Sequence, residues 1–149
     1  MTEPLITVEK FIDAEPAAVW DALTQKTSAM FMGADVDTDW RPGSPITFSG
    51  EFKGKPFRDR GEIRLCDPKR HLAFTHFSES SGKPDLLENY NFIDIRLERQ
   101  GEGTNVNLSQ TPQGEHSFDE QTIAEFRKNW DIMLDGLKKA AEEKALAPS

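Results

Sequence analysis

The chain has 149 residues, with 18 basic and 26 acidic side chains and a formal net charge of −8. This acidic balance argues against nucleic acid or an anionic membrane surface as the main partner. A single cysteine, Cys66, excludes an internal disulfide and a cysteine metal cluster. Apolar runs are too short for membrane insertion, so we expect one cytoplasmic domain over residues 1–149, with a loose tail at 144–149.

The N-terminal segment predicts a strand followed by a short helix. Polar and apolar side chains alternate over residues 5–12, which is the pattern of a strand. Pro16 then begins a helix, because the first helical position needs no free N–H. Val19, Trp20 and Leu23 would form the buried face of this helix. The segment 27–32 is compatible with a further turn or two of helix.

The middle of the chain predicts a run of antiparallel strands. We expect these strands near residues 34–40, 45–52, 56–66, 71–77, 86–97 and 104–110. Turn residues such as Arg41–Gly43 separate them, and the short loops imply antiparallel pairing. Alternation within several strands, for example of Ile93 and Ile95 with Asp94, predicts one apolar face and one solvated face.

The segment from Ser117 to about Glu143 has the period of one long helix. Apolar residues recur at steps of three and four: Ile123, Phe126, Trp130, Met133, Leu134, Leu137 and Ala141. Ser117 followed by Glu120 is typical of a capping box, which predicts where the helix starts. The chain is therefore predicted to be α+β, with a curved antiparallel sheet of about seven strands around this helix.

Several of these motifs resemble one known superfamily. Pro16–Thr24 resembles the first helix of the START-like, or helix-grip, superfamily, and Arg41–Gly43 resembles its turn after the second strand. Gly61–Pro68 and Leu72–Thr75 resemble its next pair of strands, and Asn129-Trp130 with Leu134 and Leu137 resembles its closing helix. In this order the motifs resemble the heat-shock-protein-90 ATPase activator homologue-like family.

The resemblance implies a deep cavity between the sheet and the long helix, which many relatives use to hold an apolar small molecule. We expect its walls to comprise Trp40, Phe48, Phe57, Phe74, Tyr90, Phe126, Trp130 and Met133, with Met30 and Phe31 near the mouth. His76 replaces an aromatic residue that is frequent in the family, which implies a more polar ligand.

His76 and Tyr90 are the residues expected to orient polar groups of the ligand. His76 has the same strand parity as Leu72 and Phe74, which points it toward the cavity. The alternatives are a core histidine with a satisfied hydrogen bond, and a Tyr90 hydroxyl that is buried against a backbone partner.

Two charged clusters have a functional and a structural interpretation. Asp35, Asp37 and Asp39 share one strand face and could hold calcium, but we favour a solvated outer face, and no metal or cofactor is expected. A basic strip comprises Lys53, Lys55, Arg58, Arg60 and Arg64. This strip could dock an acidic partner such as a chaperone, but we favour cross-strand ion pairs.

Three functions remain, in order of preference. The first is binding of an apolar or amphipathic small molecule, such as a lipid, isoprenoid, quinone or polyketide-like compound, by a monomeric or homodimeric carrier or sensor. The second is a co-chaperone-like module that acts on a heat-shock ATPase through the basic strip. The third is a cyclase-like or hydrolase-like enzyme, which ranks last because the sequence shows no nucleophile–base pair and no metal set.

Overall fold

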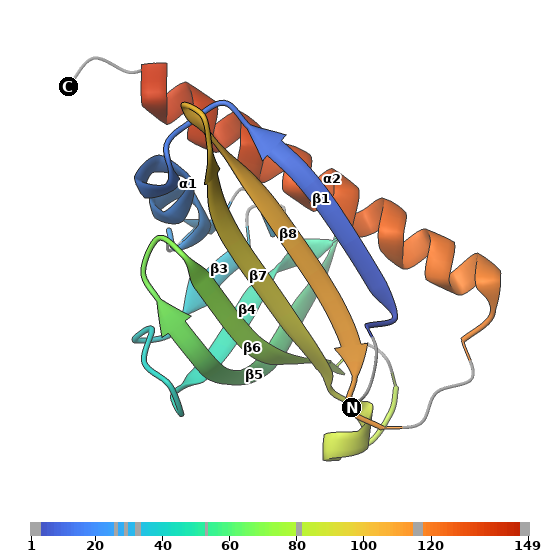
Figure 1. Cartoon of the computed structure of the whole chain (residues 1–149). Helices are drawn as coiled ribbons and strands as arrows, with labels where there is room; N and C mark the ends of the chain where they lie inside the picture. Colours follow the sequence, from blue (N-terminus) through green and yellow to red (C-terminus); the bar gives the residue numbers. More distant parts are fainter. Residues whose placement is uncertain are drawn as a thin grey trace.

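The fold is a curved sheet that wraps around one long helix (Figure 1). The computed structural model describes residues 4–25, 27–28, 30–31, 34–52, 54–79, 82–114 and 118–146. In these residues eight strands form one antiparallel sheet in the order β1-β8-β7-β6-β5-β4-β3-β2. Because β2 has only two residues, the prediction of an α+β helix-grip fold with about seven strands is confirmed.

The elements follow the predicted order. The strands are β1 (Ile6–Ile12), β2 (Thr27–Ser28), β3 (Ala34–Asp37), β4 (Pro45–Phe52), β5 (Lys55–Asp67), β6 (His71–Ser78), β7 (Asn91–Gln100) and β8 (Gly103–Pro112). The helices are α1 (Pro16–Leu23), the short 3-10 helix η2 (Leu87–Asn89) and α2 (Glu120–Leu146). Helix α1 lies at one end of the sheet beside the C-terminal half of α2, and η2 lies at the other end (Figure 1).

Three predicted boundaries are wrong for identifiable reasons. Thr27 and Ser28 form strand β2 instead of helix, because they pair with Asp35 and Ala34 of β3. Strand β3 ends at Asp37, and Trp40 has a φ of 61°, which is left-handed backbone that no strand adopts. The expected strand 86–97 begins only at Asn91, because residues 87–89 form η2.

Helix α2 begins at Glu120, and Asp119 is its N-cap. The Asp119 carboxylate Oδ1 accepts a hydrogen bond of 2.8 Å from the backbone N–H of Thr122. Ser117, the expected cap, lies outside the described residues. The predicted cap is therefore corrected from Ser117 to Asp119. Aspartate is also a strong cap residue, and the Asp119 side chain is the one that accepts a hydrogen bond from Thr122, the third residue of the helix.

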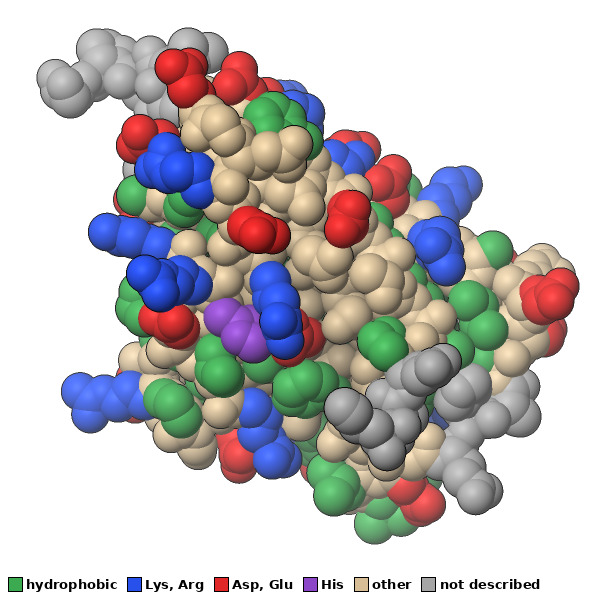
Figure 2. Space-filling model, in the orientation of Figure 1, with side chains coloured by type: hydrophobic (Ala, Val, Ile, Leu, Met, Phe, Trp, Pro, Cys, Tyr) green, Lys and Arg blue, Asp and Glu red, His purple; other side chains and the backbone are tan. Residues whose placement is uncertain are grey.

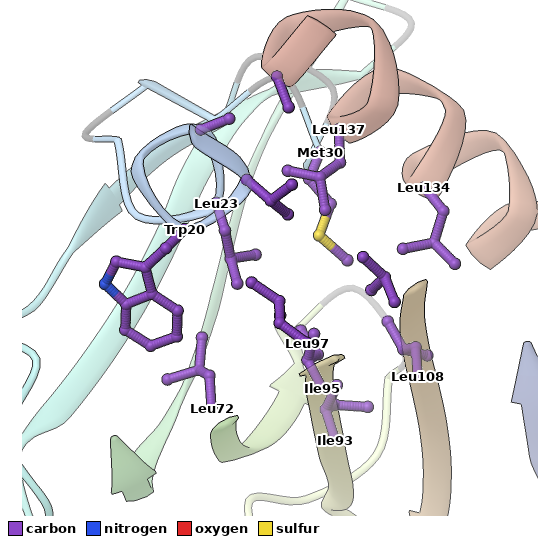
Figure 3. Packing of buried hydrophobic residues seen from close by; sticks show 14 of the residues in the cluster. Trp20, Leu23, Met30, Leu72, Ile93, Ile95, Leu97, Leu108, Leu134 and Leu137 are labelled. Atoms are coloured by element: carbon purple, nitrogen blue, oxygen red, sulfur yellow. The ribbon is translucent and has the colours of Figure 1, made fainter. Parts of the chain in front are cut away.

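The core lies between the two helices and the sheet. Leu134 and Leu137 of α2 belong to one cluster with Leu23 of α1, Met30 and the apolar face of the strands, and Trp20 lies on the side of α1 away from α2, next to Leu72 (Figure 3). Leu134, Leu137 and Ala141 are fully buried, whereas Ile123, Phe126, Trp130 and Met133 are only partly buried. The predicted apolar face of α2 is therefore confirmed, but only its C-terminal half is sealed.

Ion pairs hold the exposed side of α2 to strand β1. Lys10 Nζ lies 2.9 Å from Asp131 Oδ1 and 2.5 Å from Asp135 Oδ1. Near the other end, the backbone N–H of Asp13 donates to Glu142 Oε2 at 2.9 Å. These contacts fix the helix along the β1 edge of the sheet and so fix its height above the strands.

The surface carries charges of both signs. Figure 2 shows Lys and Arg side chains beside Asp and Glu side chains over the visible face, without one dominant patch. Among the described helices, none combines the length and the apolar character that crossing a membrane requires. The surface therefore offers less information about function than the interior.

Candidate functional site

A cavity of about 680 Å³ lies between the sheet and the N-terminal half of α2. Its walls come from three strands, the segment around η2 and the helix. The lining residues are His76, Ser78, Lys83, Glu88, Asn89, Tyr90, Asn91, Ile93, Gln110, Pro112, Phe118, Phe126, Asn129, Trp130 and Met133. The cavity therefore occupies the stretch where the apolar face of α2 is only partly buried.

The strand register explains why the cavity has a polar floor. Near α1, the inward positions Leu72, Ile95 and Leu108 pair across three strands and are all buried apolar residues. Four residues further along the strands, the same register aligns His76 of β6, Asn91 of β7 and Pro112 of β8. The inner face of the sheet thus changes from apolar to polar toward the η2 end.

The roof of the cavity is aromatic and is anchored to the floor. Trp130 Nε1 donates a hydrogen bond of 2.6 Å to Oε1 of Gln110, a buried residue of β8. Phe126 meets the edge of Phe118, with 5.2 Å between ring centroids, and Lys83 Nζ lies 5.4 Å from the Phe118 ring centroid. At this end the cavity wall therefore combines the Lys83 ammonium group with aromatic rings.

His76 and Asp59 form a pair on the inner face of β6 and β5. Nε2 of His76 lies 2.9 Å from Oδ2 of Asp59, and the side chains are 26% and 18% exposed. The Phe48 ring meets the His76 ring edge-on, with 5.6 Å between centroids. His76 therefore lines the cavity and also has the satisfied hydrogen bond that the alternative interpretation required.

Tyr90 belongs to a set of contacts that holds the segment before β7 to strands β5 and β6. We call this set, which comprises Arg60, Phe77, Glu79, Asp85 and Tyr90, the latch. The Tyr90 hydroxyl donates a hydrogen bond of 2.6 Å to Oδ1 of Asp85, and its ring stacks on Phe77 at 5.1 Å. Arg60 pairs with Asp85 at 2.8 Å and with Glu79 at 2.9 Å. Burial, reinforced by the hydrogen bond to Asp85, raises the pKa of Tyr90.

The structure divides the expected cavity residues into two groups. His76, Tyr90, Phe126, Trp130 and Met133 line the cavity.

The other six lie away from it. Met30, Phe48 and Phe74 are fully buried core residues. Phe31 packs on Phe48 with 4.8 Å between centroids, Trp40 packs against the core, and Phe57 lies over Gly50. None of these six side chains lines the cavity.

Sequence reasoning missed the polar lining residues. Gln110, Asn91 and Asn129 are of residue types that ordinarily indicate solvated positions. One signal was present, because Gln110 continues the inward parity of Val106 and Leu108 on β8.

The described residues of the two charged clusters do not line the cavity. Asp35 and Asp37 are exposed and alternate with buried Ala34 and Val36. In the basic strip, Arg60 pairs with Glu79 and Asp85 as part of the latch, and Arg64 pairs with Glu62 on the same strand at 3.2 Å. Lys55 and Arg58 are exposed, and Lys53 lies outside the described residues.

An antiparallel sheet around one long helix, with a cavity between them, defines the helix-grip class of proteins. Residues 13–142 match the family described as Activator of Hsp90 ATPase homolog 1-like protein, and the chain belongs to this family. No curated protein is significantly similar to the chain in sequence.

Solved structures with the same fold cover nearly the whole chain. ChR145 from Cytophaga hutchinsonii is 35% identical over 99% of both chains, with a TM-score of 0.78. CalU16 from Micromonospora echinospora is 24% identical over 97% of this chain and 83% of its own, with a TM-score of 0.67. The Aha1 dimer from Colwellia psychrerythraea is 21% identical over 92% and 95%, with a TM-score of 0.67. The last two similarities establish the fold alone.

Proposed function

We propose that this protein binds an apolar or amphipathic small molecule between α2 and the sheet, as a carrier or sensor. The observation that carries the proposal is the cavity of about 680 Å³. Small-molecule sites commonly measure about 300–1,000 Å³ and combine apolar walls with a few placed polar groups. A fatty acid, isoprenoid, quinone or polyketide-like compound has the size and character to occupy it.

The partly buried half of α2 supplies the driving force for such binding. Phe126, Trp130 and Met133 line the cavity and are only partly buried. A guest that covers them gains roughly 25 cal/mol for each Å² of apolar surface removed from water. His76 and Tyr90 are the proposed polar contacts, although the Tyr90 hydroxyl already donates to Asp85.

A co-chaperone-like role is the second candidate, and it depends on the basic strip. The family is named after activators of the Hsp90 ATPase, and Lys55 and Arg58 are exposed on β5. We rank it second because Arg60 and Arg64 already have acidic partners within the protein. A homodimer is compatible with either role, since the similar Aha1 protein from Colwellia psychrerythraea is a dimer.

A thermal-shift screen tests the first candidate. The panel contains fatty acids, isoprenoids, quinones and flavonoid-like compounds. A guest at a hundredfold over its dissociation constant stabilises the folded state by about 2.7 kcal/mol. For a domain of this size the melting temperature then rises by roughly 5–10 °C. If no compound in a broad panel raises the melting temperature, the carrier proposal fails and the co-chaperone role becomes the first candidate.

A matched pair of variants links the stabilisation to the cavity. Met133→Trp places a larger side chain in the cavity wall, so we expect it to weaken the stabilising compound without unfolding the protein. Ile132→Ala is the control, because Ile132 is the neighbouring helix residue and is 46% exposed. Equal effects of the two substitutions would place the bound compound outside the cavity.

A further inference from the structure

We infer that His76 and Asp59 select, among guests of similar shape, those that present a hydroxyl group to the imidazole. This inference rests on the proposed function, and it names the chemical class that the cavity prefers. The guest would be an amphipathic molecule, apolar on the side facing Phe126 and Trp130, with an alcohol or phenol on the side facing β6.

The His76–Asp59 pair lies where the inner face of the sheet changes from apolar to polar. On the α1 side of the pair, the inward positions of β5 and β6 are Ile63, Leu72 and Phe74, which are all buried and apolar. By strand alternation, Asp59 and His76 point to the same inner face of the sheet as these residues. Two polar side chains therefore lie at the border of an apolar surface. Placing polar groups there destabilises the fold unless they are hydrogen-bonded, and the 2.9 Å contact satisfies one atom of each residue.

The chemistry of the pair determines what His76 offers to a guest. An ionised carboxylate only accepts hydrogen bonds, so with Asp59 ionised the Nε2–H group of His76 is the donor in this contact. In a neutral imidazole the other nitrogen, Nδ1, is then an acceptor. Within the described residues the structure shows no hydrogen bond to Nδ1, and His76 lines the cavity. The matching group on a guest is therefore a donor, for which a hydroxyl is the simplest choice.

The pair is held rigidly before any guest arrives. The Phe48 ring packs edge-on against the imidazole, and Asp59 fixes its other side. Gly61 lets the two strands approach closely beside the pair, since a Cβ there would lie 1.6 Å from the carbonyl oxygen of Thr75. A preorganised acceptor loses little conformational entropy when it binds, so the hydrogen bond contributes to selectivity.

The test uses two naphthalenes of nearly equal shape, with binding measured by isothermal titration calorimetry. The probes are 2-naphthol, which has a hydroxyl, and 2-methoxynaphthalene, in which a methyl group replaces the hydroxyl proton. The ratio of their dissociation constants is measured in the wild type and in His76→Phe, so that differences in hydration of the free probes cancel. We expect the preference for 2-naphthol to fall by roughly three- to tenfold in His76→Phe, the range for one hydrogen bond.

Two further variants keep the result interpretable. Asp59→Asn keeps nearly the same shape, but an amide can donate a hydrogen bond as well as accept one. The tautomer of His76 is then no longer determined by residue 59. We therefore expect the preference for 2-naphthol to fall in this variant too. His71→Phe is the matched control. His71 Nε2 lies 2.9 Å from Asp94 Oδ2, the same geometry on the outer face of the same strand, and His71 does not line the cavity. We expect no change in the ratio for this control.

The outcomes separate the inference from the proposed function. Binding of both naphthalenes with the same ratio in wild type and His76→Phe would overturn the inference and leave the carrier function standing. Tighter binding of 2-naphthoate than of 2-naphthol, lost in His76→Phe, would overturn it in favour of a protonated imidazole that binds anions. If neither naphthalene binds the wild type, both the inference and the carrier function for aromatic guests fail.

Discussion

The indole of Trp130 is tied to the side-chain amide of Gln110 by a hydrogen bond of 2.6 Å that joins α2 to β8. Gln110 is only 6% exposed, and its inward neighbours on β8, Val106 and Leu108, are fully buried. Since both side chains line the cavity, this contact positions the aromatic roof over the polar floor. The stability of the fold and the shape of the cavity are therefore linked at one hydrogen bond.

Gln110→Leu should lower the stability of the protein and move the indole. The substitution removes the acceptor of Trp130 Nε1 while it keeps a side chain of similar size. Because water in the open cavity can reach the freed N–H, we expect a loss of only about 1 kcal/mol, which is a melting temperature lower by roughly 2–4 °C. Tryptophan emission should shift as well. Gln100→Leu, at the exposed end of β7, is the control, and an equal effect there would contradict the role of Gln110.

Tyr90 should titrate at unusually high pH. Because it is the single tyrosine, absorbance near 295 nm reports on it alone. Burial and the hydrogen bond to Asp85 raise its pKa, so Asp85→Asn should lower the pKa toward the ordinary value of about 10 without reaching it. The distant substitution Asp67→Asn should leave the titration unchanged. An Asp85→Asn titration that coincides with the wild type would show that the latch is open in solution.

The same shift gives stability a defined pH dependence. Since the folded-state pKa of Tyr90 is raised, folding favours the protonated phenol. Its contribution to the free energy of unfolding is fully present below about pH 10, the unfolded-state pKa, and is lost as pH rises through the folded-state pKa. Urea unfolding between pH 9 and pH 11 should show this loss in the wild type and a smaller one in Asp85→Asn. Parallel curves for both proteins would contradict the assignment.

The cap of α2 should give a second pH dependence, on the acid side. Hydrogen bonds from the Thr122 hydroxyl and backbone N–H lower the pKa of Asp119. Its stabilising effect is therefore present above about pH 4, the unfolded-state pKa, and is lost as pH falls through the folded-state pKa. Asp119→Ala should melt at lower temperature than the wild type at pH 7. Asp119→Asn keeps a capping side chain that does not ionise, so its melting temperature should fall less than that of the wild type as the pH is lowered. If Asp119→Ala or Asp119→Asn had the wild-type melting temperature at every pH, this role of Asp119 would be refuted.

Gly61 should be the least replaceable residue near the His76–Asp59 pair. A Cβ at this position would lie 1.6 Å from the carbonyl oxygen of Thr75 on the neighbouring strand. Gly61→Ala must push β5 and β6 apart, so we expect a loss of about 3 kcal/mol in urea unfolding. Glu62→Ala, the adjacent exposed position, should change stability by less than about 0.5 kcal/mol. Similar values for the two variants would show that the strands separate at little cost.

Local sequence patterns predicted most of the fold because they depend on the period of a single element. Strand β4 has the bounds that alternation and turn residues indicated, and α2 buries the face that the steps of three and four indicated. The errors occurred where a neighbour in space decides the local structure. Thr27 and Ser28 are a strand only because β3 pairs with them, and Asp119 caps α2 because its side chain meets the N–H of Thr122.

The sequence by itself determined that one long helix carries Phe126, Trp130 and Met133 on a single apolar face, because that face follows from the helical period. Only the tertiary structure decided that these residues line a cavity while Phe48 and Phe74 fill the core. The physical reason is that filling depends on the distance between helix and sheet, which is set by contacts far apart in the chain, such as Lys10 with Asp131 and Trp130 with Gln110. Periodicity shows which way a side chain points, but the packing distance determines whether it meets another side chain or a space that a guest can occupy.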